Sequence, residues 1–252
     1  MANHYDAHLI ADGFDIRADA ASQRYNMLLM GWQGAYLQAI DASPSFKPSV
    51  LGDLLGTAAQ LARTYQETEH NEIGAATESV SLDAHQRATQ ALGSGVPHEY
   101  WDAITERLIA ARSDLSSELQ AQTARDLRQL HKSYYQAMLD IHMVARSQGI
   151  SRATARIQQR GRHSSVPFMF RDRAGRRWSS PTFARTVWRQ HLVNTFNSST
   201  LEALSAAGER AGQVYHEDPA KSGQRIQIGA YNDVADELFH PNARGVLGAI
   251  SQ

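Results

Sequence analysis

The alternation of apolar and polar residues along the first 150 positions is typical of long helices. Between residues 18 and 40 the apolar side chains recur three or four positions apart, at Tyr25, Leu28, Leu29, Trp32, Tyr36 and Ile40. Two prolines within residues 41–48 interrupt this pattern, and a second helix is expected to follow. Residues 68–81 are polar and leave their structure open, whereas residues 82–92 favour a short helix that ends at Gly93.

The strongest prediction is one long helix from about Pro97 to Ser147. Apolar residues run through it at spacings of three or four with one gap at Thr123, and no glycine or proline interrupts it before Gly149. About 50 residues at about 1.5 Å each would extend about 75 Å, which is longer than a compact domain requires. This pattern indicates packing against partner helices in a bundle or an assembly. The alternative is two helices with a kink near residues 113–117.

After Gly149 the predicted segments become short and mixed. Ser151 is placed to cap a helix. A longer helix is expected to start at Ser180 and Pro181, with Ser180 as its capping residue, and to end near Gly208. The other expected segments are a helix through residues 151–160, strands at 166–170, 213–216 and 225–228, a turn at 171–177 with Gly175 at its tip, and a helix at 231–238. The predicted fold class is therefore mainly α, with an N-terminal bundle or rod of long helices (residues 1–150) followed by a small α+β C-terminal domain (residues 151–252).

Composition narrows the cellular setting. The chain has 252 residues, of which 42% are hydrophobic, and this is enough to bury a core. It has no cysteine, which excludes disulfides, thiolate metal sites and a cysteine nucleophile. No apolar run approaches the roughly 20 residues of a membrane helix, and the N-terminus lacks the features of a secretory signal. We therefore expect a soluble protein that is made in a cytoplasm and has no membrane partner.

The net charge of −1 conceals an asymmetry along the chain. Residues 1–150 contain 18 acidic and 11 basic residues, whereas residues 151–252 contain 8 acidic and 14 basic residues. Ten arginines lie between Arg152 and Arg189, against the single acid Asp172. Such a cluster indicates contact with phosphates or with an acidic protein surface, and the candidate contact residues are Arg160, Arg162, Arg171, Arg173, Arg176 and Arg177. The alternative is a solvated surface balanced by the acidic half of the chain.

Aromatic residues beside these arginines have two possible roles. Trp178, Phe183, Trp188 and Phe196 can stack on nucleic-acid bases. The helical spacing around Phe183 favours core packing instead.

Catalytic signatures are missing from the sequence. It has no phosphate-binding glycine loop that ends in Lys-Ser/Thr, and no Gly-x-Ser-x-Gly motif. His216, Asp218 and His240 can form a zinc site in principle, but nothing in their spacing requires one. We therefore expect a protein that is not an enzyme and has neither a metal nor another cofactor.

Three separated motifs lie in order in the C-terminal part. Asp172, Gly175, Arg176 and Trp178 form a D-x-x-G-R-x-W turn, Arg189 follows on the next helix, and residues 238–244 read Leu-Phe-His-Pro-Asn-Ala-Arg. Over about residues 150–250 these motifs resemble the phage minor capsid and head morphogenesis family, which includes the minor head protein F of phage Mu and the minor capsid protein 2 group. Gln190 and Ala243 replace a threonine and a cysteine of the family pattern, and a Cys-Pro-x-Cys segment expected near residues 216–221 is missing.

The resemblance implies a structural virion protein without catalysis. Such proteins lie inside the phage head near the portal vertex and assist head morphogenesis, and some act in DNA packaging or ejection. The implied partners are the portal protein, the major capsid or scaffold protein and packaged DNA, with several copies in a larger assembly. The motif residues that are implied to be structural are Asp172, Gly175, Arg176, Trp178, Arg189, His240, Pro241, Asn242 and Arg244. The alternative function is that of a nucleic-acid-binding protein that acts through residues 152–189.

Overall fold

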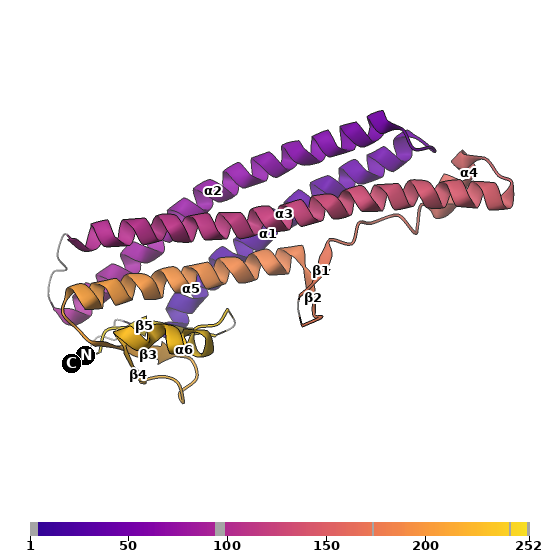
Figure 1. Ribbon diagram of the computed structural model, residues 1–252. Helices are drawn as coiled ribbons and strands as arrows, with labels where there is room; N and C mark the ends of the chain where they lie inside the picture. Colours follow the sequence, from indigo (N-terminus) through magenta and orange to yellow (C-terminus); the bar gives the residue numbers. More distant parts are fainter. Residues whose placement is uncertain (1–4, 94–98, 173, 242, 251–252) are drawn as a thin grey trace. The chain divides into compact units, whose positions relative to one another are not determined.

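The computed structural model describes residues 5–93, 99–172, 174–241 and 243–250, with the side chains of residues 99–103 excepted (Figure 1). The fold is mainly α, with long helices followed by a small C-terminal α+β region, as predicted. The helices are α1 (Ala7–Ala42), α2 (Pro48–Leu92), α3 (Glu99–Gln148), α4 (Arg152–Gln159), α5 (Ser180–Ala206) and α6 (Tyr231–Leu238), with a 3-10 turn at Ile228–Ala230. The strands are β1 (Met169–Arg171), β2 (Arg177–Ser179), β3 (Ala211–His216), β4 (Arg225–Gln227) and β5 (Gly245–Gly248).

The long helix predicted near residues 97–147 is confirmed as α3. It runs from Glu99 to Gln148 as a single element, so the alternative of two helices near residues 113–117 is wrong. Pro97, the predicted start, lies outside the described residues. Gly149 has a φ of 64° directly after the helix, a left-handed conformation that glycine adopts at low cost.

Helices α1 and α2 are longer than the sequence pattern indicated. Helix α1 begins at Ala7 because the Asp6 carboxylate accepts hydrogen bonds from the backbone N–H groups of His8 (3.0 Å) and Leu9 (3.2 Å). Helix α2 continues without a break from Pro48 to Leu92, so the expectation of a separate helix over residues 82–92 is wrong.

The start of α5 also differs in one detail from the prediction. The helix begins at Ser180, but the capping side chain is that of Ser179, whose Oγ accepts a hydrogen bond from the Thr182 N–H at 3.3 Å. The Ser180 hydroxyl is used elsewhere, because it donates to the Asp126 carboxylate at 3.0 Å. The Ser151 cap of α4 is as predicted, with the Thr154 N–H donating to its Oγ at 3.1 Å.

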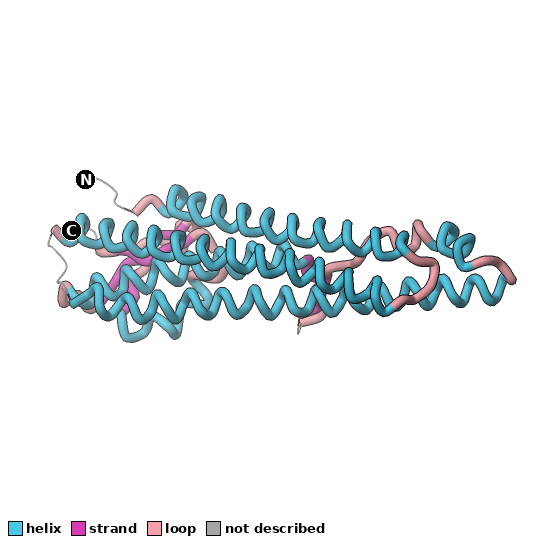
Figure 2. Tube along the Cα trace, turned by 90° about the horizontal axis from the view of Figure 1, so that it is seen from above, coloured by secondary structure: helices cyan, strands magenta, loops and turns pink. Residues whose placement is uncertain are grey.

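The strands among the described residues form two short antiparallel sheets (Figure 2). Strands β1 and β2 pair as a hairpin, and the second sheet has the order β4-β3-β5. Strand β5 was missed from the sequence because its four residues are all buried and show no alternation. Gly248 is required in this strand, since a Cβ there would lie 2.7 Å from the rings of Tyr5 and Tyr215.

The chain divides into two compact units that are each assembled from separated segments. Unit 1 consists of residues 1–21, 69–118 and 184–252, and unit 2 consists of residues 22–68 and 119–183. Helices α1, α2 and α3 therefore each contribute residues to both units. Each unit draws on residues from both sides of position 150.

In unit 1, polar contacts link α2 to α5 inside the core. The Trp188 indole N–H donates to the Glu69 carboxylate at 2.9 Å, and the Ser199 hydroxyl donates to that of Ser81 at 2.9 Å. All four of these side chains are buried. Phe196 is buried as well and packs edge-on against Phe14. Trp188 and Phe196 are therefore core residues, as the helical spacing around Phe183 indicated.

In unit 2, the core contains a buried carboxylate. Asp126 accepts hydrogen bonds from the Tyr25 hydroxyl (2.7 Å), from Ser180 Oγ (3.0 Å) and from the Gln122 amide (3.2 Å). Burial raises the pKa of Asp126, and these hydrogen bonds act in the opposite direction. Trp32, two turns after Tyr25 on α1, is fully buried in the same unit. Its indole N–H donates to the Ala58 carbonyl at 2.9 Å.

Candidate functional site

The first predicted motif forms the tip of the β1–β2 hairpin in unit 2. The Asp172 carboxylate accepts hydrogen bonds from the Arg176 backbone N–H (2.9 Å), from Arg176 Nε (2.7 Å) and from Trp178 Nε1 (3.0 Å). Gly175 has a φ of 79°, which is the reason this turn position needs glycine. Burial of Asp172 would raise its pKa, but the hydrogen bonds from Arg176 and Trp178 outweigh it and lower the pKa. All four residues of the motif therefore build the turn.

The candidate contact arginines of unit 2 keep most of their surface in solvent. Arg160 pairs with Asp41 at 3.4 Å and Arg162 with Asp140 at 3.8 Å, yet the two side chains are 71% and 72% exposed. Arg171 donates to the Gly175 carbonyl at 3.1 Å and remains exposed, as does Arg177. Arg176 is exposed apart from its bond to Asp172. Arg173 lies outside the described residues.

The second and third motifs meet in unit 1 around a buried arginine. The Arg189 side chain is only 3% exposed. Its Nε donates to Asp15 Oδ1 at 2.8 Å, and its Nη1 donates to the backbone carbonyls of Pro241 (2.5 Å) and Ala243 (2.9 Å). Arg189 therefore links α5 to the segment that leads into β5. His240 is exposed in this segment, and Asn242 lies outside the described residues.

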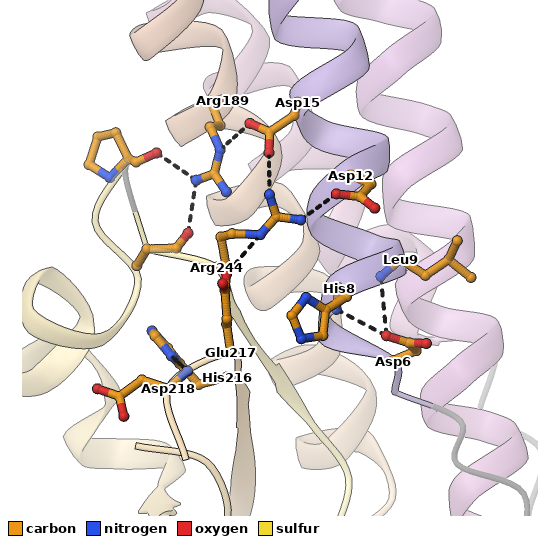
Figure 3. Close-up of polar contacts among 12 residues, drawn as sticks. Asp6, His8, Leu9, Asp12, Asp15, Arg189, His216, Glu217, Asp218 and Arg244 are labelled. Atoms are coloured by element: carbon orange, nitrogen blue, oxygen red, sulfur yellow. Dashed lines mark hydrogen bonds and ion pairs between the residues drawn. The ribbon is translucent and has the colours of Figure 1, made fainter. Parts of the chain in front are cut away.

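Arg244 completes the same cluster, which we call the Asp15 cluster: Asp12, Asp15, Arg189, Glu217 and Arg244. Arg244 Nη1 donates to Asp15 Oδ2 at 3.2 Å, and Arg244 also pairs with Asp12 and, at 2.9 Å, with Glu217. Figure 3 shows the guanidinium groups of Arg189 and Arg244 both directed at the Asp15 carboxylate. The hydrogen bond from Arg244 to Asp12 raises the pKa of Arg244 more than burial lowers it.

Sequence reasoning missed Asp15, although it joins two of the predicted motifs. The available signal was the run of Asp12, Asp15 and Asp19 at helical spacing near the start of α1. Arg185 pairs with Asp19 and, at 3.1 Å, with Asp15, so three guanidinium groups surround the Asp15 carboxylate. The Asp15 carboxylate therefore links α1 to α5 and to the segment that contains Arg244.

Two of the three candidate metal ligands, His216 and Asp218, accept hydrogen bonds within their own turn. His216 Nδ1 accepts a hydrogen bond from the Asp218 N–H at 2.8 Å, and Asp218 Oδ1 accepts one from the Ala220 N–H at 2.9 Å. Burial lowers the pKa of His216. Across the described part of the chain, no group of three or more His, Asp or Glu side chains is arranged to hold a metal ion.

The net charges of the two units differ more than those of residues 1–150 and 151–252. Unit 1 contains 20 acidic and 10 basic residues, and unit 2 contains 6 acidic and 15 basic residues. The arginine-rich stretch is divided between the two units, because Arg185 and Arg189 belong to unit 1 and are paired with aspartates there. Within the arginine-rich stretch, the described arginines at positions 152–171 and 176–177 in unit 2 are therefore the part suited to contact an anionic partner.

No protein-family model, curated protein or solved structure matches the chain. Within the described ranges, no helix combines the length and the apolar character needed to cross a bilayer.

Proposed function

We propose that the chain is a structural protein of a phage virion. It would be a minor capsid protein inside the head near the portal vertex, made in the host cytoplasm and incorporated during head morphogenesis. The observation that carries this proposal is the ordered set of three motifs that resembles the pattern of the phage minor capsid family. The geometry supports the proposal. In the first motif, the Asp172 carboxylate accepts a hydrogen bond from Arg176, and in the third motif the carbonyls of Pro241 and Ala243 accept hydrogen bonds from Arg189.

The proposed partners are the portal protein, the major capsid or scaffold protein and packaged DNA. The long helices suit a part of an assembly, in which several copies bind neighbouring proteins. The Asp15 cluster suits a structural role, because its carboxylates are paired with arginines. The basic surface of unit 2 suits contact with DNA or with acidic protein surface.

Analysis of phage particles tests this proposal. In a phage that encodes this chain, we expect mass spectrometry to detect the chain in proheads and purified virions, in few copies relative to the major capsid protein. We also expect it to copurify with the portal protein after tails are removed, and its deletion to reduce the yield of DNA-filled heads. Particles that lack the chain, together with a normal phage yield after its deletion, would contradict the proposal.

A second candidate function is nucleic-acid binding through unit 2. The observation that favours it is the set of exposed arginines that includes Arg162, Arg171 and Arg177, in a unit with 15 basic and 6 acidic residues. Arg185 and Arg189 do not belong to this surface, which shortens the predicted segment from 152–189 to 152–177.

Binding to duplex DNA at a series of salt concentrations tests the second candidate. We expect the logarithm of affinity to fall linearly with the logarithm of salt, because each phosphate contact releases counterions. The variant Arg171→Ala/Arg177→Ala should reduce the magnitude of the slope by about 2, or about 1 for each phosphate contact removed. The control Arg63→Ala, an exposed arginine on α2 of the same unit, should leave the slope unchanged. Equal slopes for all three proteins, or no binding at low salt, would exclude this function.

A further inference from the structure

Helix α1 carries a stripe of exposed residues on a different side from the face that packs in the core. The core face includes Phe14, Tyr25 and Trp32, which are buried. The stripe has the alternating spacing of four and three residues that is typical of two-helix coiled coils. We call it the α1 stripe, and it consists of Leu9, Gly13, Ile16, Ala20, Gln23, Met27, Met30 and Gly34. None of these eight residues is buried.

The large apolar side chains of the α1 stripe keep most of their surface in solvent. Those that are 64–70% exposed are Leu9, Ile16, Met27 and Met30. A Cβ atom added at Gly13 or Gly34 would meet no atom beyond its own helical turn within 4 Å, so these positions are open as well. Contiguous exposed apolar surface typically marks an interaction site, and a helix with apolar residues on two sides normally has both sides covered. The α1 stripe is therefore a surface for a partner.

The order of large and small residues in the α1 stripe is complementary to itself. When two α1 helices lie antiparallel and their stripes overlap fully, the first residue of one stripe faces the last residue of the other. The four kinds of layer are then Leu9 with Gly34, Gly13 with Met30, Ile16 with Met27, and Ala20 with Gln23. Every layer contains at least one large side chain, and each glycine faces a large one, which is how facing helices interdigitate.

We propose that two copies of this chain form a symmetric dimer through the α1 stripe, with the two α1 helices antiparallel. A parallel pair would place each residue opposite its own counterpart, so that Gly13, Ala20 and Gly34 would form layers without any large side chain. Such layers leave voids, which protein interiors and well-packed contacts avoid. The antiparallel contact uses the same surface on both copies, as the interface of a two-fold dimer requires.

The charges of the two units favour the same orientation. Residues 9–20 of the stripe belong to unit 1 and residues 23–34 to unit 2, so each antiparallel layer joins unit 1 of one copy to unit 2 of the other. Unit 1 contains 20 acidic and 10 basic residues, whereas unit 2 contains 6 acidic and 15 basic residues. The antiparallel dimer therefore brings unlike charges together, and a parallel dimer would oppose like charges.

Charged residues beside the stripe do not reverse this preference. A parallel pair would bring Asp12 and Asp19 of one copy near arginines of the other, in the flanking positions that form salt bridges in coiled coils. Asp12 already pairs with Arg244 of its own chain, and Asp19 already pairs with Arg185. A parallel dimer would therefore exchange existing ion pairs for new ones and would add none at these aspartates.

The size pattern also selects a second copy over a lipid surface. An amphipathic helix on a membrane needs apolar area on one side, but the order of large and small residues along it has no consequence there. Only a partner with the reverse order fills the open positions at Gly13 and Gly34, and a second antiparallel α1 has that order. The inference does not depend on the proposed role in a virion.

Sedimentation velocity of the full chain over a range of concentrations tests the association. We expect a reversible increase in mass from the 27.9 kDa monomer to a dimer and no further. Ile16→Glu/Met27→Glu places four carboxylates within the contact and should associate at least tenfold more weakly than the wild type. The control Ile109→Glu, at a 60% exposed position on α3, should associate like the wild type. A wild type that stays monomeric or forms species larger than a dimer would overturn the proposal, as would a dimer that persists in Ile16→Glu/Met27→Glu.

Cross-linking of introduced cysteines determines the orientation, because the chain has no cysteine of its own. In the antiparallel dimer residue 16 faces residue 27, whereas the two copies of residue 16 are about 16 Å apart along the helix axis. A disulfide requires Cα atoms within about 7 Å of each other. Under mild oxidation a mixture of Ile16→Cys and Met27→Cys should therefore form a disulfide-linked dimer, and each variant alone should not. Cross-linking of each variant with itself but not in the mixed pair would overturn the antiparallel contact.

An exchange of large and small residues tests one layer of the contact. Gly13→Met places a second large side chain against Met30 of the other copy and should weaken association at least tenfold. Adding Met30→Ala removes the excess volume from the same layer and should restore association to the wild-type level. Adding Leu9→Ala instead removes volume from another layer and should not. Circular dichroism melting checks that each variant is folded, and equal association of the two double variants would contradict the proposed register.

Discussion

Lowering the pH from about 6.5 to about 4 is expected to reduce the free energy of unfolding by about 3 kcal/mol through one residue, His191. The side chain of His191 lies in unit 1 on α5 and is buried. Burial, and secondarily the positive charge of Arg112, lowers its pKa from 6.5 to about 4, whereas Asp114 acts in the opposite direction. The unfolded chain therefore binds the proton first as the pH falls. The stability that neutral His191 confers is complete above pH 6.5 and is lost as the pH falls through about 4.

The hydrogen bonds around His191 explain why the neutral form is required. The Thr77 hydroxyl donates to the Ile73 carbonyl at 2.6 Å, and Thr77 Oγ1 lies 2.8 Å from His191 Nε2. Since the single hydroxyl proton of Thr77 points to Ile73, His191 must donate through Nε2–H. A second proton would have to be placed on Nδ1, which puts a positive charge in the interior of unit 1.

Urea unfolding at a series of pH values, compared between wild type and His191→Gln, measures this effect. The glutamine amide can donate to Thr77 from about the same position but does not take up a proton. The stability lost between pH 6.5 and 4 should therefore be smaller in the variant by about 3 kcal/mol. His142→Gln, at an exposed histidine on α3, should retain the wild-type pH dependence. Equal losses in wild type and His191→Gln would show that His191 does not carry the effect.

Local signals in the sequence were sufficient for several elements. The uninterrupted apolar spacing predicted α3, the Ser151 side chain predicted the start of α4, and α6 was predicted at residues 231–238, where it lies. These features depend on contacts between residues a few positions apart, which a sequence pattern records directly.

Elements that depend on distant partners were not predictable in this way. The polar pattern of residues 68–81 left their structure open, and Glu69, Thr77 and Ser81 are all buried in α2. Their partners are Trp188, His191 and Ser199 of α5, more than 100 positions away along the chain. Polar residues satisfied by a second helix do not appear in a pattern of apolar positions, so the continuity of α2 could not be read from the sequence.

The sequence motifs included two residues of the Asp15 cluster, Arg189 and Arg244, but not the carboxylates that connect them. The motifs supplied Arg189 and the segment that contains Pro241 and Arg244, whereas Asp15, which joins them, comes from the other end of the chain. The arginine-rich stretch looked like one surface in the sequence. The fold divides it, since Arg185 and Arg189 are neutralised by aspartates in unit 1 and the arginines up to Arg177 belong to unit 2.

Replacement of Arg189 by methionine is expected to cost about 3–5 kcal/mol of unfolding free energy, the range typical of removing one partner from a buried ion pair. Methionine fills part of the volume but donates no hydrogen bond. The carbonyls of Pro241 and Ala243 would lose their donor, and Asp15 would lose its best-buried partner. Because these carbonyls precede β5, amide hydrogen exchange in residues 245–248 should become faster in the variant.

Arg185→Met is the matched control for this prediction. Arg185 lies one turn earlier on α5 and also pairs with Asp15, but its side chain is 37% exposed. Ion pairs in contact with solvent contribute about 0–1 kcal/mol, so this variant should lose at most that amount and should leave exchange in β5 unchanged. Urea unfolding and hydrogen exchange of the two variants side by side measure the difference. Equal losses in both would mean that the Asp15 cluster stabilises the chain through charge alone, and that the bonds from Arg189 to the 241–243 backbone contribute nothing.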